Sequence, residues 1–202
     1  MTKRKVFISY HHANDQKYKK ALTDLNEKHN IFIDMSVELG DIPDDLPDQS
    51  IRKIIRDEYL KDSTILILLV GSETKNRKHI DWEIYSSMYD GEVNKKMGIL
   101  IITLPEIFSY SRVSSEEEKK KIYPNATNWI TLETRKEYEE KYPHMPARVI
   151  DNFLKKNVKI SVVNWEHING NPNNLSYLIN EAYENKSSNE YDLSRAMRKN
   201  NS

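Results

Sequence analysis

The sequence predicts an α/β fold in which helices cover both faces of a central, mainly parallel five-stranded sheet. The first hundred residues alternate between short β-branched apolar runs and longer segments of helical periodicity, the pattern of parallel strands joined by crossover helices. Residues 63–70 are apolar on both faces, as expected for a central strand that helices cover on each side. The length of 202 residues suits one domain with a sizeable insertion.

Apolar runs rich in β-branched residues define the strands, and apolar residues at helical spacing define the helices. Strands are predicted at residues 5–10, 31–33, 63–70, 96–104 and 158–165. Helices are predicted after a cap at Asn14 or Asp15 and at residues 49–60, 77–89 and 174–184. The strand at residues 31–33 is so short that we expect it to be a buried piece of the sheet.

Three segments lie outside this regular pattern. Residues 34–47 contain two prolines, one glycine and four aspartates, a composition typical of a long functional loop. Residues 105–157 predict an insertion with one or two helices before the last strand. Residues 186–202 are rich in Asn, Ser, Lys and Arg, so we expect a flexible C-terminal tail that buries little. The single domain is predicted to span residues 1–185.

Charge and composition exclude several classes of protein. Lys+Arg and Asp+Glu number 31 each and the isoelectric point is about 7.0, so no overall field attracts nucleic acid or an anionic membrane. With no cysteine the chain has no disulfide or thiolate site, which suits a reducing cytosol. The apolar run at residues 65–70 is too short to span a bilayer, and the N-terminus has no apolar signal-peptide core. We therefore expect a soluble cytoplasmic protein.

Polar residues gather where the predicted strands end. The first strand leads into residues 9–14, the second into residues 34–36, and the third passes through Gly71 to the helix that carries Glu83. Ligands of open parallel sheets bind at the carboxyl ends of the strands, where successive crossovers lie on opposite faces. Three separate segments therefore converge on one rim, which is the predicted binding site.

These segments resemble Toll/interleukin-1 receptor (TIR) domains. Residues 6–10 and 31–34 look like the opening of such domains, and residues 34–47 stand where the family has its BB loop. Residues 79–84 are similar to the third-helix motif of TIR enzymes, in which the glutamate is catalytic. The sequence of this motif most resembles that of the TIR-like proteins of bacterial antiphage defence, in particular the sensor subunit of Thoeris systems. The resemblance covers residues 3–104 and the strand near residue 158, and it implies a flavodoxin-like TIR fold.

The resemblance implies an enzyme that cleaves the nicotinamide–ribose bond of NAD+. This bond breaks through an oxocarbenium-like state, and an ionised Glu83 placed against the ribose would stabilise the developing positive charge without a metal or cofactor. The acceptor is water, giving ADP-ribose, or an atom of the same molecule, giving a cyclic ADP-ribose isomer. In Thoeris sensors a cyclic product acts as a signal to a downstream effector protein. An activating trigger, with a phage-derived molecule as candidate, and self-association of the active form are also implied.

Further site residues follow from the same resemblance. Ser9, His11, Asp34 and Ser36 are candidates for lining the dinucleotide pocket, and His79 is a candidate for lying beside the ribose or nicotinamide. The sequence departs from the family at two places. Many TIR enzymes carry an aromatic residue where His79 stands, and some carry two basic residues where His11 and His12 stand, which are only partly cationic near neutral pH.

Several of these candidate site residues also have a plainer interpretation. Glu83 and His79 could be exposed helix residues, His11 part of a polar turn, and Asp34 a cap of the loop that follows it. Trp82 is expected to pack in the core or in an interface. The histidines show no ligand spacing with a third partner, so no metal site is predicted.

Two other classes of function remain open. A TIR-like interaction module would assemble through its BB loop and leave Glu83 dispensable. A phosphoacceptor domain built around Asp34 is less favoured, because the acidic pair expected after its first strand is absent.

Overall fold

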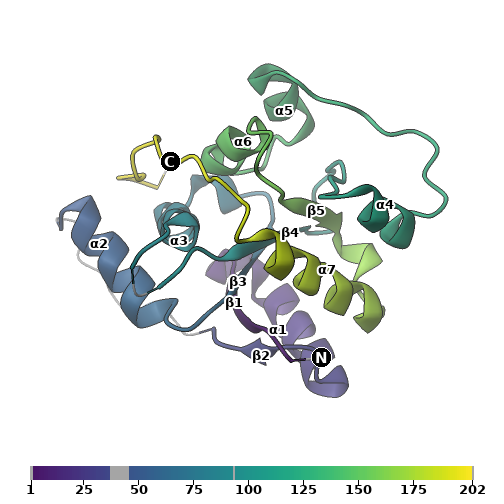
Figure 1. The fold of residues 1–202 in the computed structure, drawn as a ribbon, viewed down its shortest axis with the longest axis horizontal. Helices are drawn as coiled ribbons and strands as arrows, with labels where there is room; N and C mark the ends of the chain where they lie inside the picture. Colours follow the sequence, from purple (N-terminus) through teal and green to yellow (C-terminus); the bar gives the residue numbers. More distant parts are fainter. Residues whose placement is uncertain (1, 37–45, 93, 202) are drawn as a thin grey trace.

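The computed structural model describes residues 2–36, 46–92 and 94–201, which form five parallel strands with helices on both faces (Figure 1). The strand order is β2-β1-β3-β4-β5, and every strand pair in the sheet is parallel. The strands are β1 (Lys5–Ser9), β2 (Ile33–Asp34), β3 (Ile65–Val70), β4 (Gly98–Thr103) and β5 (Ser161–Asn164). The predicted α/β fold class, with its five-stranded parallel sheet, is confirmed.

Two groups of helices cover the two faces of the sheet. One hydrophobic core joins the sheet to α2 (Asp48–Ile54), α3 (Lys78–Met88), α5 (Arg135–Lys141) and α6 (Ala147–Phe153). The other joins it to α1 (His12–His29), α4 (Glu116–Ile122) and α7 (Pro172–Asn185). A π-helical turn at Ile55–Tyr59 extends α2, and short 3₁₀ turns lie at Thr74–Asn76 and Trp165–His167.

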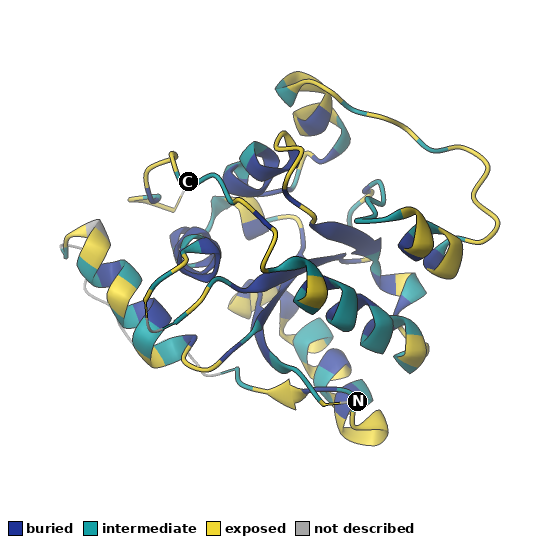
Figure 2. Ribbon diagram, in the orientation of Figure 1, coloured by how far each residue is buried: buried dark blue, intermediate teal, exposed yellow. Residues whose placement is uncertain are grey.

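Alternate residues of the central strand β3 enter the two cores. Leu66 and Leu68 belong to the core on the α3 side, whereas Ile65 and Ile67 belong to the core on the α1 side. All six residues of β3 are buried, which explains why the strand is an unbroken apolar run (Figure 2). The chain leaves β1 through α1 on one face and reaches β3 through α2 on the other. The crossovers therefore change face between β1 and β3, which is where open sheets bind ligands.

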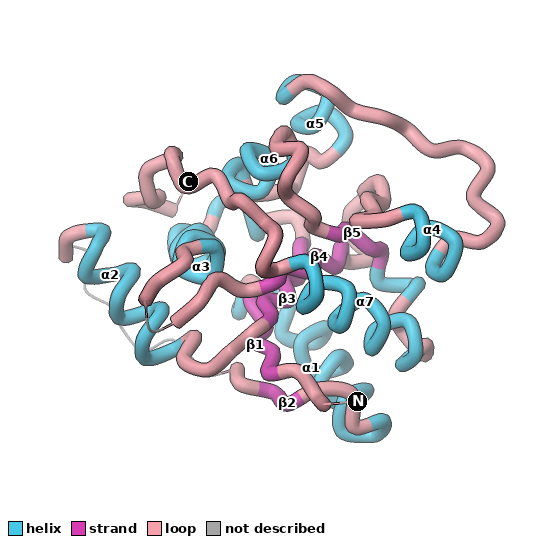
Figure 3. Tube along the Cα trace, in the orientation of Figure 1, coloured by secondary structure: helices cyan, strands magenta, loops and turns pink. Residues whose placement is uncertain are grey.

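The second strand differs from the prediction. β2 contains only Ile33 and Asp34, pairs with Lys5 and Val6 of β1, and lies at the edge of the sheet (Figure 3). Its two residues are exposed, and Ile33 retains 44% of its accessible surface. The expectation of a buried strand at residues 31–33 is wrong, because an edge strand is open on one side. Phe32, just before it, is the residue that enters the core.

The first helix begins earlier than predicted. α1 starts at His12 with His11 as its N-cap residue, and no side chain caps it. Asn14 and Asp15, the predicted caps, stand inside the helix, and Asp15 is buried. The predicted helices at 77–89 and 174–184 are confirmed as α3 and α7, with ends shifted by one or two residues.

The segment between β4 and β5 holds three short helices, α4, α5 and α6, where one or two were expected. A long connection joins α4 to α5 (Figure 3). Arg112 forms an antiparallel bridge with Val162, so the segment is fastened to β5 before α4 begins. The limits of this insertion, 105–157, stay a prediction.

The C-terminal segment packs against the domain at a few points, and the predicted flexible tail, residues 186–202, stays a prediction. After α7 the chain runs back past α3 and α6 (Figure 1), and Asn189 and Met197 are buried. The Asn189 side chain accepts a hydrogen bond from the Lys159 amide at 2.7 Å and donates to the Lys159 carbonyl at 3.2 Å. A polar segment can pack in this way because its contacts are hydrogen bonds rather than apolar burial, which composition does not reveal.

The contact between α7 and β4 at Gly98 makes a testable feature of the fold. A Cβ at Gly98 of β4 would lie 2.1 Å from the carbonyl oxygen of Ala182 in α7, so Gly98→Ala should destabilise the fold by about 3 kcal/mol or more. Gly170→Ala is the matched control: its Cβ would meet no atom within 4 Å, and its φ of 73° should cost only about 1 kcal/mol. Urea denaturation of both variants measures the difference, and equal losses would contradict the close contact.

Candidate active site

The carboxyl group of Glu83 lies inside the protein, at the end of β1. Glu83 is 4% exposed and accepts a hydrogen bond from the hydroxyl of Ser9 at 2.5 Å. Ser9 is the last residue of β1 and is 1% exposed. Two of the predicted site residues, 74 positions apart in the sequence, are therefore in direct contact at the carboxyl end of a central strand.

Glu83 faces inward because α3 is buried on almost every side. Ile80 and Ile84, one turn apart on this helix, enter the core with the sheet, and Trp82 is 2% exposed. Nine of the eleven residues of α3 are buried, which is typical of a helix enclosed by neighbours rather than one lying on a surface. The interpretation of Glu83 as a solvated charge is wrong.

Burial changes the protonation of this carboxyl group. Loss of contact with water raises the pKa of Glu83 from 4.5 to about 8, and the hydrogen bond from Ser9 acts in the opposite direction. Glu83 therefore carries a proton near neutral pH, whereas the sequence predicted an ionised carboxylate. The reason is that, among the described residues, only the hydrogen bond from Ser9 opposes the effect of burial.

His11 is the N-cap residue of α1 and is buried, with 8% of its surface exposed. Burial is the largest cause that lowers the pKa of His11, and the positive charge of Arg77 is the next. Its Nδ1 atom has no hydrogen-bond partner among the described residues. His11 is thus a neutral imidazole at the rim of the sheet, two residues after Ser9, and not a cation.

Asp34 and Ser36 stabilise the turn after β2. The backbone amide of Ser36 donates to the Asp34 carboxylate at 2.8 Å, and the Ser36 hydroxyl accepts from the amide of Ile8 at 3.0 Å. Lys19 also lies 3.8 Å from the Asp34 carboxylate. These contacts favour the plainer interpretation of Asp34 as a cap. Ser36 reaches β1 next to Ser9, but residues 37–45, the central part of the expected BB loop, lie outside the described residues.

His79 is half-buried, one helical turn before Glu83, and its ring packs edge-on against Trp82 with centroids 5.0 Å apart. The Trp82 indole nitrogen donates to the carbonyl oxygen of Arg198 at 2.8 Å. The expected core packing of Trp82 is confirmed. The proposed role of His79 beside the ribose stays a prediction.

The sequence did not predict a buried ion pair that lies next to Glu83. Arg148 of α6 is 0% exposed and donates to both carboxylate oxygens of Asp81, at 2.9 and 3.0 Å. Arg148 also donates to the carbonyl oxygens of Arg195 and Ala196 in the C-terminal segment. Asp81 lies on α3 two positions before Glu83, so this pair fixes the helix from the side opposite Ser9. No local pattern signals it, because its two residues are 67 positions apart.

Two acidic residues, Asp15 and Glu106, lie at the carboxyl edge of the sheet next to Gly71. A Cβ at Gly71, just after β3, would meet Asp15 and Glu106 oxygens, each at 2.9 Å. Burial, with Glu106 as a second cause, raises the pKa of Asp15 to about 6. Glycine at this position leaves room for the two carboxyl groups to approach each other, and the sequence offered Gly71 only as the end of a strand.

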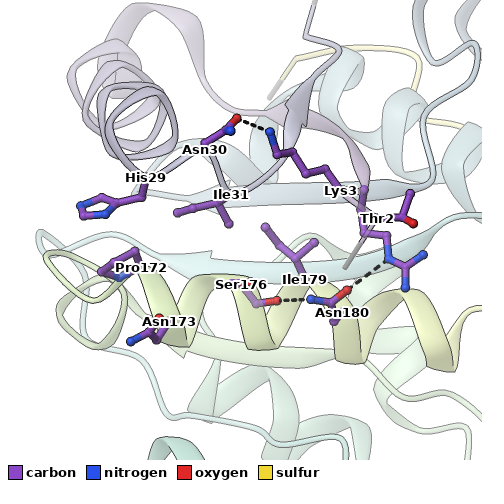
Figure 4. Close-up of a pocket in the computed structure, with 11 residues that line it drawn as sticks. Thr2, Lys3, His29, Asn30, Ile31, Pro172, Asn173, Ser176, Ile179 and Asn180 are labelled. Atoms are coloured by element: carbon purple, nitrogen blue, oxygen red, sulfur yellow. Dashed lines mark hydrogen bonds between the residues drawn. The ribbon is translucent and has the colours of Figure 1, made fainter.

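One cavity of about 270 Å³ lies away from this edge (Figure 4). Residues 2–4, Asn30 and Ile31 line it where the chain enters β1 and β2, and Ser176 and Asn180 line it from α7. The amino ends of the strands are opposite the ends that carry Ser9 and Asp34, so this cavity is not the predicted site.

Residues 7–107 match the family model described as Thoeris protein ThsB, TIR-like domain. The matched half of the chain runs from β1 to the end of β4 and contains both Ser9 and Glu83. The sequence matches no curated protein. Within the described parts of the chain, no helix has the length and apolar character needed to cross a membrane.

The raised pKa of Glu83 predicts a pH-dependent penalty to folding. Above pH 4.5 the Glu83 carboxyl is ionised in the unfolded chain, whereas in the folded protein it keeps its proton up to about pH 8. The free energy of unfolding therefore falls as pH rises through this range. Glu83→Gln removes this penalty. Its free energy of unfolding, relative to that of wild type, should therefore rise by about 3 to 5 kcal/mol from about pH 5 to about pH 9.

Urea denaturation of wild type and variant at both pH values measures this gain. Glu140→Gln, at an exposed position of α5, is the control and should leave the difference between the two pH values unchanged. Parallel behaviour of Glu83→Gln and wild type would show that the carboxyl group is not protonated in the fold.

Proposed function

The chain belongs to the ThsB family of TIR-like domains from Thoeris antiphage defence, and on that premise we propose that it cleaves NAD+ between nicotinamide and ribose. The observation that carries this proposal is the buried contact between Glu83 and Ser9 at the carboxyl end of β1. This contact lies at the change of crossover face, where an open parallel sheet binds its ligand.

The burial of Glu83 suits the proposed chemistry. Cleavage leaves positive charge on the ribose C1′ as the bond to the nicotinamide nitrogen breaks, and a carboxylate in a low-dielectric site stabilises that charge more strongly than one in water. A cationic nicotinamide ring nearby favours the ionised form, so we propose that substrate binding displaces the proton of Glu83 to solvent. Ser9 then donates to the carboxylate and fixes its orientation.

The acceptor decides the product. Attack by water yields ADP-ribose, nicotinamide and a proton, while attack by a nucleophilic atom of the same molecule yields a cyclic ADP-ribose isomer, nicotinamide and a proton. We propose the cyclic isomer as the product and its release as a signal to a downstream effector protein. No metal and no resident cofactor enter this proposal.

Access to Glu83 suggests how the activity is controlled. With 4% of its surface exposed, Glu83 can touch a ribose only after neighbouring residues move. We propose that self-association or a phage-derived activator brings about this movement, so that the protein at rest turns over little substrate.

The same burial favours one competing function. An enclosed carboxyl group that is hydrogen-bonded to a serine can also have a purely structural role. Glu118 is an example, since it is 1% exposed and accepts hydrogen bonds from Ser114 and Ser161. If Glu83 had such a role, the chain would be a non-catalytic interaction module.

Release of nicotinamide distinguishes the two functions. Glu83→Gln should remain folded and lose turnover by about 100-fold or more, because it removes the charge that stabilises the transition state. Chromatography of nicotinamide and nucleotide products, with the protein alone and with lysate of phage-infected cells as activator, measures the loss.

Glu118→Gln is the matched control, since it neutralises another buried, serine-bonded glutamate, on α4. It should keep wild-type turnover. Equal activity of Glu83→Gln and wild type would refute the catalytic role, and loss in both variants would assign the effect to folding.

A further inference from the structure

A cationic cavity lies on the side of α3 that faces away from Ser9. Its volume is about 190 Å³, and it is enclosed by the segment before α3, the start of α6 and the C-terminal segment. Four of its lining residues are basic and one is acidic: Lys75, Arg77, Arg195 and Arg198 against Asp81. Such an excess of positive charge around a cavity selects for anions.

The one carboxylate in the cavity wall is already engaged. Asp81 accepts at both oxygens from Arg148, and its Oδ2 atom also accepts from the backbone amide of Arg198 at 2.8 Å. Asp81 therefore neutralises Arg148, which is fully buried and does not line the cavity. Asp81 is therefore not an ion-pair partner for Lys75 or Arg77 within 4.0 Å.

Two of the basic residues lack an acidic partner. Among the described residues, no carboxylate lies within 4.0 Å of Lys75 or Arg77. Lys75 donates to the carbonyl oxygen of Pro143 at 2.6 Å, and the Arg77 Nε atom is buried without a hydrogen-bond partner in the described chain. Arg195, by contrast, pairs with Asp151 at 2.5 and 3.2 Å. A buried donor left unpaired is unfavourable, and an anionic ligand would satisfy it.

An adjoining cavity gives the site a second character. It has a volume of about 330 Å³, shares Lys75, Ala147 and Arg198 with the first, and continues along Tyr142, Met145 and Ile150. Its lining also includes one acidic residue, Glu139, which pairs with Arg135 on α5. The two cavities together present cationic groups at one end and an aromatic and apolar wall at the other. A molecule with phosphate groups joined to a flat or apolar part matches this arrangement.

We propose that this is a binding site for a phosphate-bearing small molecule, separate from the site at Glu83. Arg77 and Lys75 contact its phosphate oxygens from the α3 side, and Arg195 and Arg198 contact them from the C-terminal segment. Asp81 and Glu83 are two positions apart, which places them about 200° apart around α3. The bound anion would join the C-terminal segment to the helix that carries Glu83, so its binding stabilises that contact.

Binding of inorganic pyrophosphate to the full chain tests the site without any measurement of activity. Isothermal titration calorimetry should detect binding to wild type. Arg77→Gln and Arg195→Gln should each weaken binding by about tenfold, because each removes one charge-assisted hydrogen bond. Lys20→Gln is the control: it removes the same charge from an exposed position of α1, where Lys20 pairs with Asp24, and should bind as wild type does.

The two arginine variants separate this site from the one at Glu83, because Arg195 lies in the C-terminal segment and Arg77 precedes α3. A loss in both variants supports the proposal. A loss in Arg77→Gln alone would place the anion elsewhere on the rim, and no binding to wild type at millimolar concentrations would refute the site. Urea unfolding of each variant confirms that its fold is intact before titration.

Discussion

The hydrogen bond between Ser9 and Glu83 is the contact on which the proposed chemistry depends. It joins the last residue of β1 to the middle of α3, and among the described residues it is the one contact that opposes the effect of burial on the pKa of Glu83. The energetic consequence is a protonated acid at neutral pH, since ionisation in the interior is unfavourable. Under the proposed function, a cationic substrate would reverse this balance, because its charge would favour the ionised carboxylate.

The helix that carries Glu83 is held from two opposite sides. Ser9 contacts one side, while Arg148 and the backbone of the C-terminal segment contact Asp81 and Trp82 on the other. The C-terminal segment thus acts as part of the wall around α3 rather than as an appendage. Because the proposed anion site lies between this segment and α3, a ligand there and a ligand at Glu83 would share one helix. This geometry connects the two sites through α3.

The sequence predicted best what depends on local pattern. The apolar run of β3 and the helical pattern around Glu83 are readable from neighbouring residues, so the sheet and the helix α3 were predicted correctly. The catalytic role of Glu83 stays a prediction. What the sequence did not reveal depends on distant partners. Ile33 is exposed because nothing pairs beyond β2, and no property of residues 31–33 reveals an edge. The C-terminal segment packs because Arg148, far away in the chain, supplies donors for its carbonyl oxygens. The pKa of Glu83 likewise depends on what encloses the helix, which the motif does not encode.

The protonation of Glu83 in the free protein is the central claim, and it can be measured directly. Glutamate labelled with ¹³C at its carboxyl carbon, assigned by comparison with Glu83→Gln, reports the titration of this group by NMR. We expect a carboxyl resonance that stays in its protonated position through neutral pH and titrates with a pKa of about 8. A titration near the ordinary value of 4.5 would contradict it, because the carboxyl group would then be hydrated and not enclosed against Ser9.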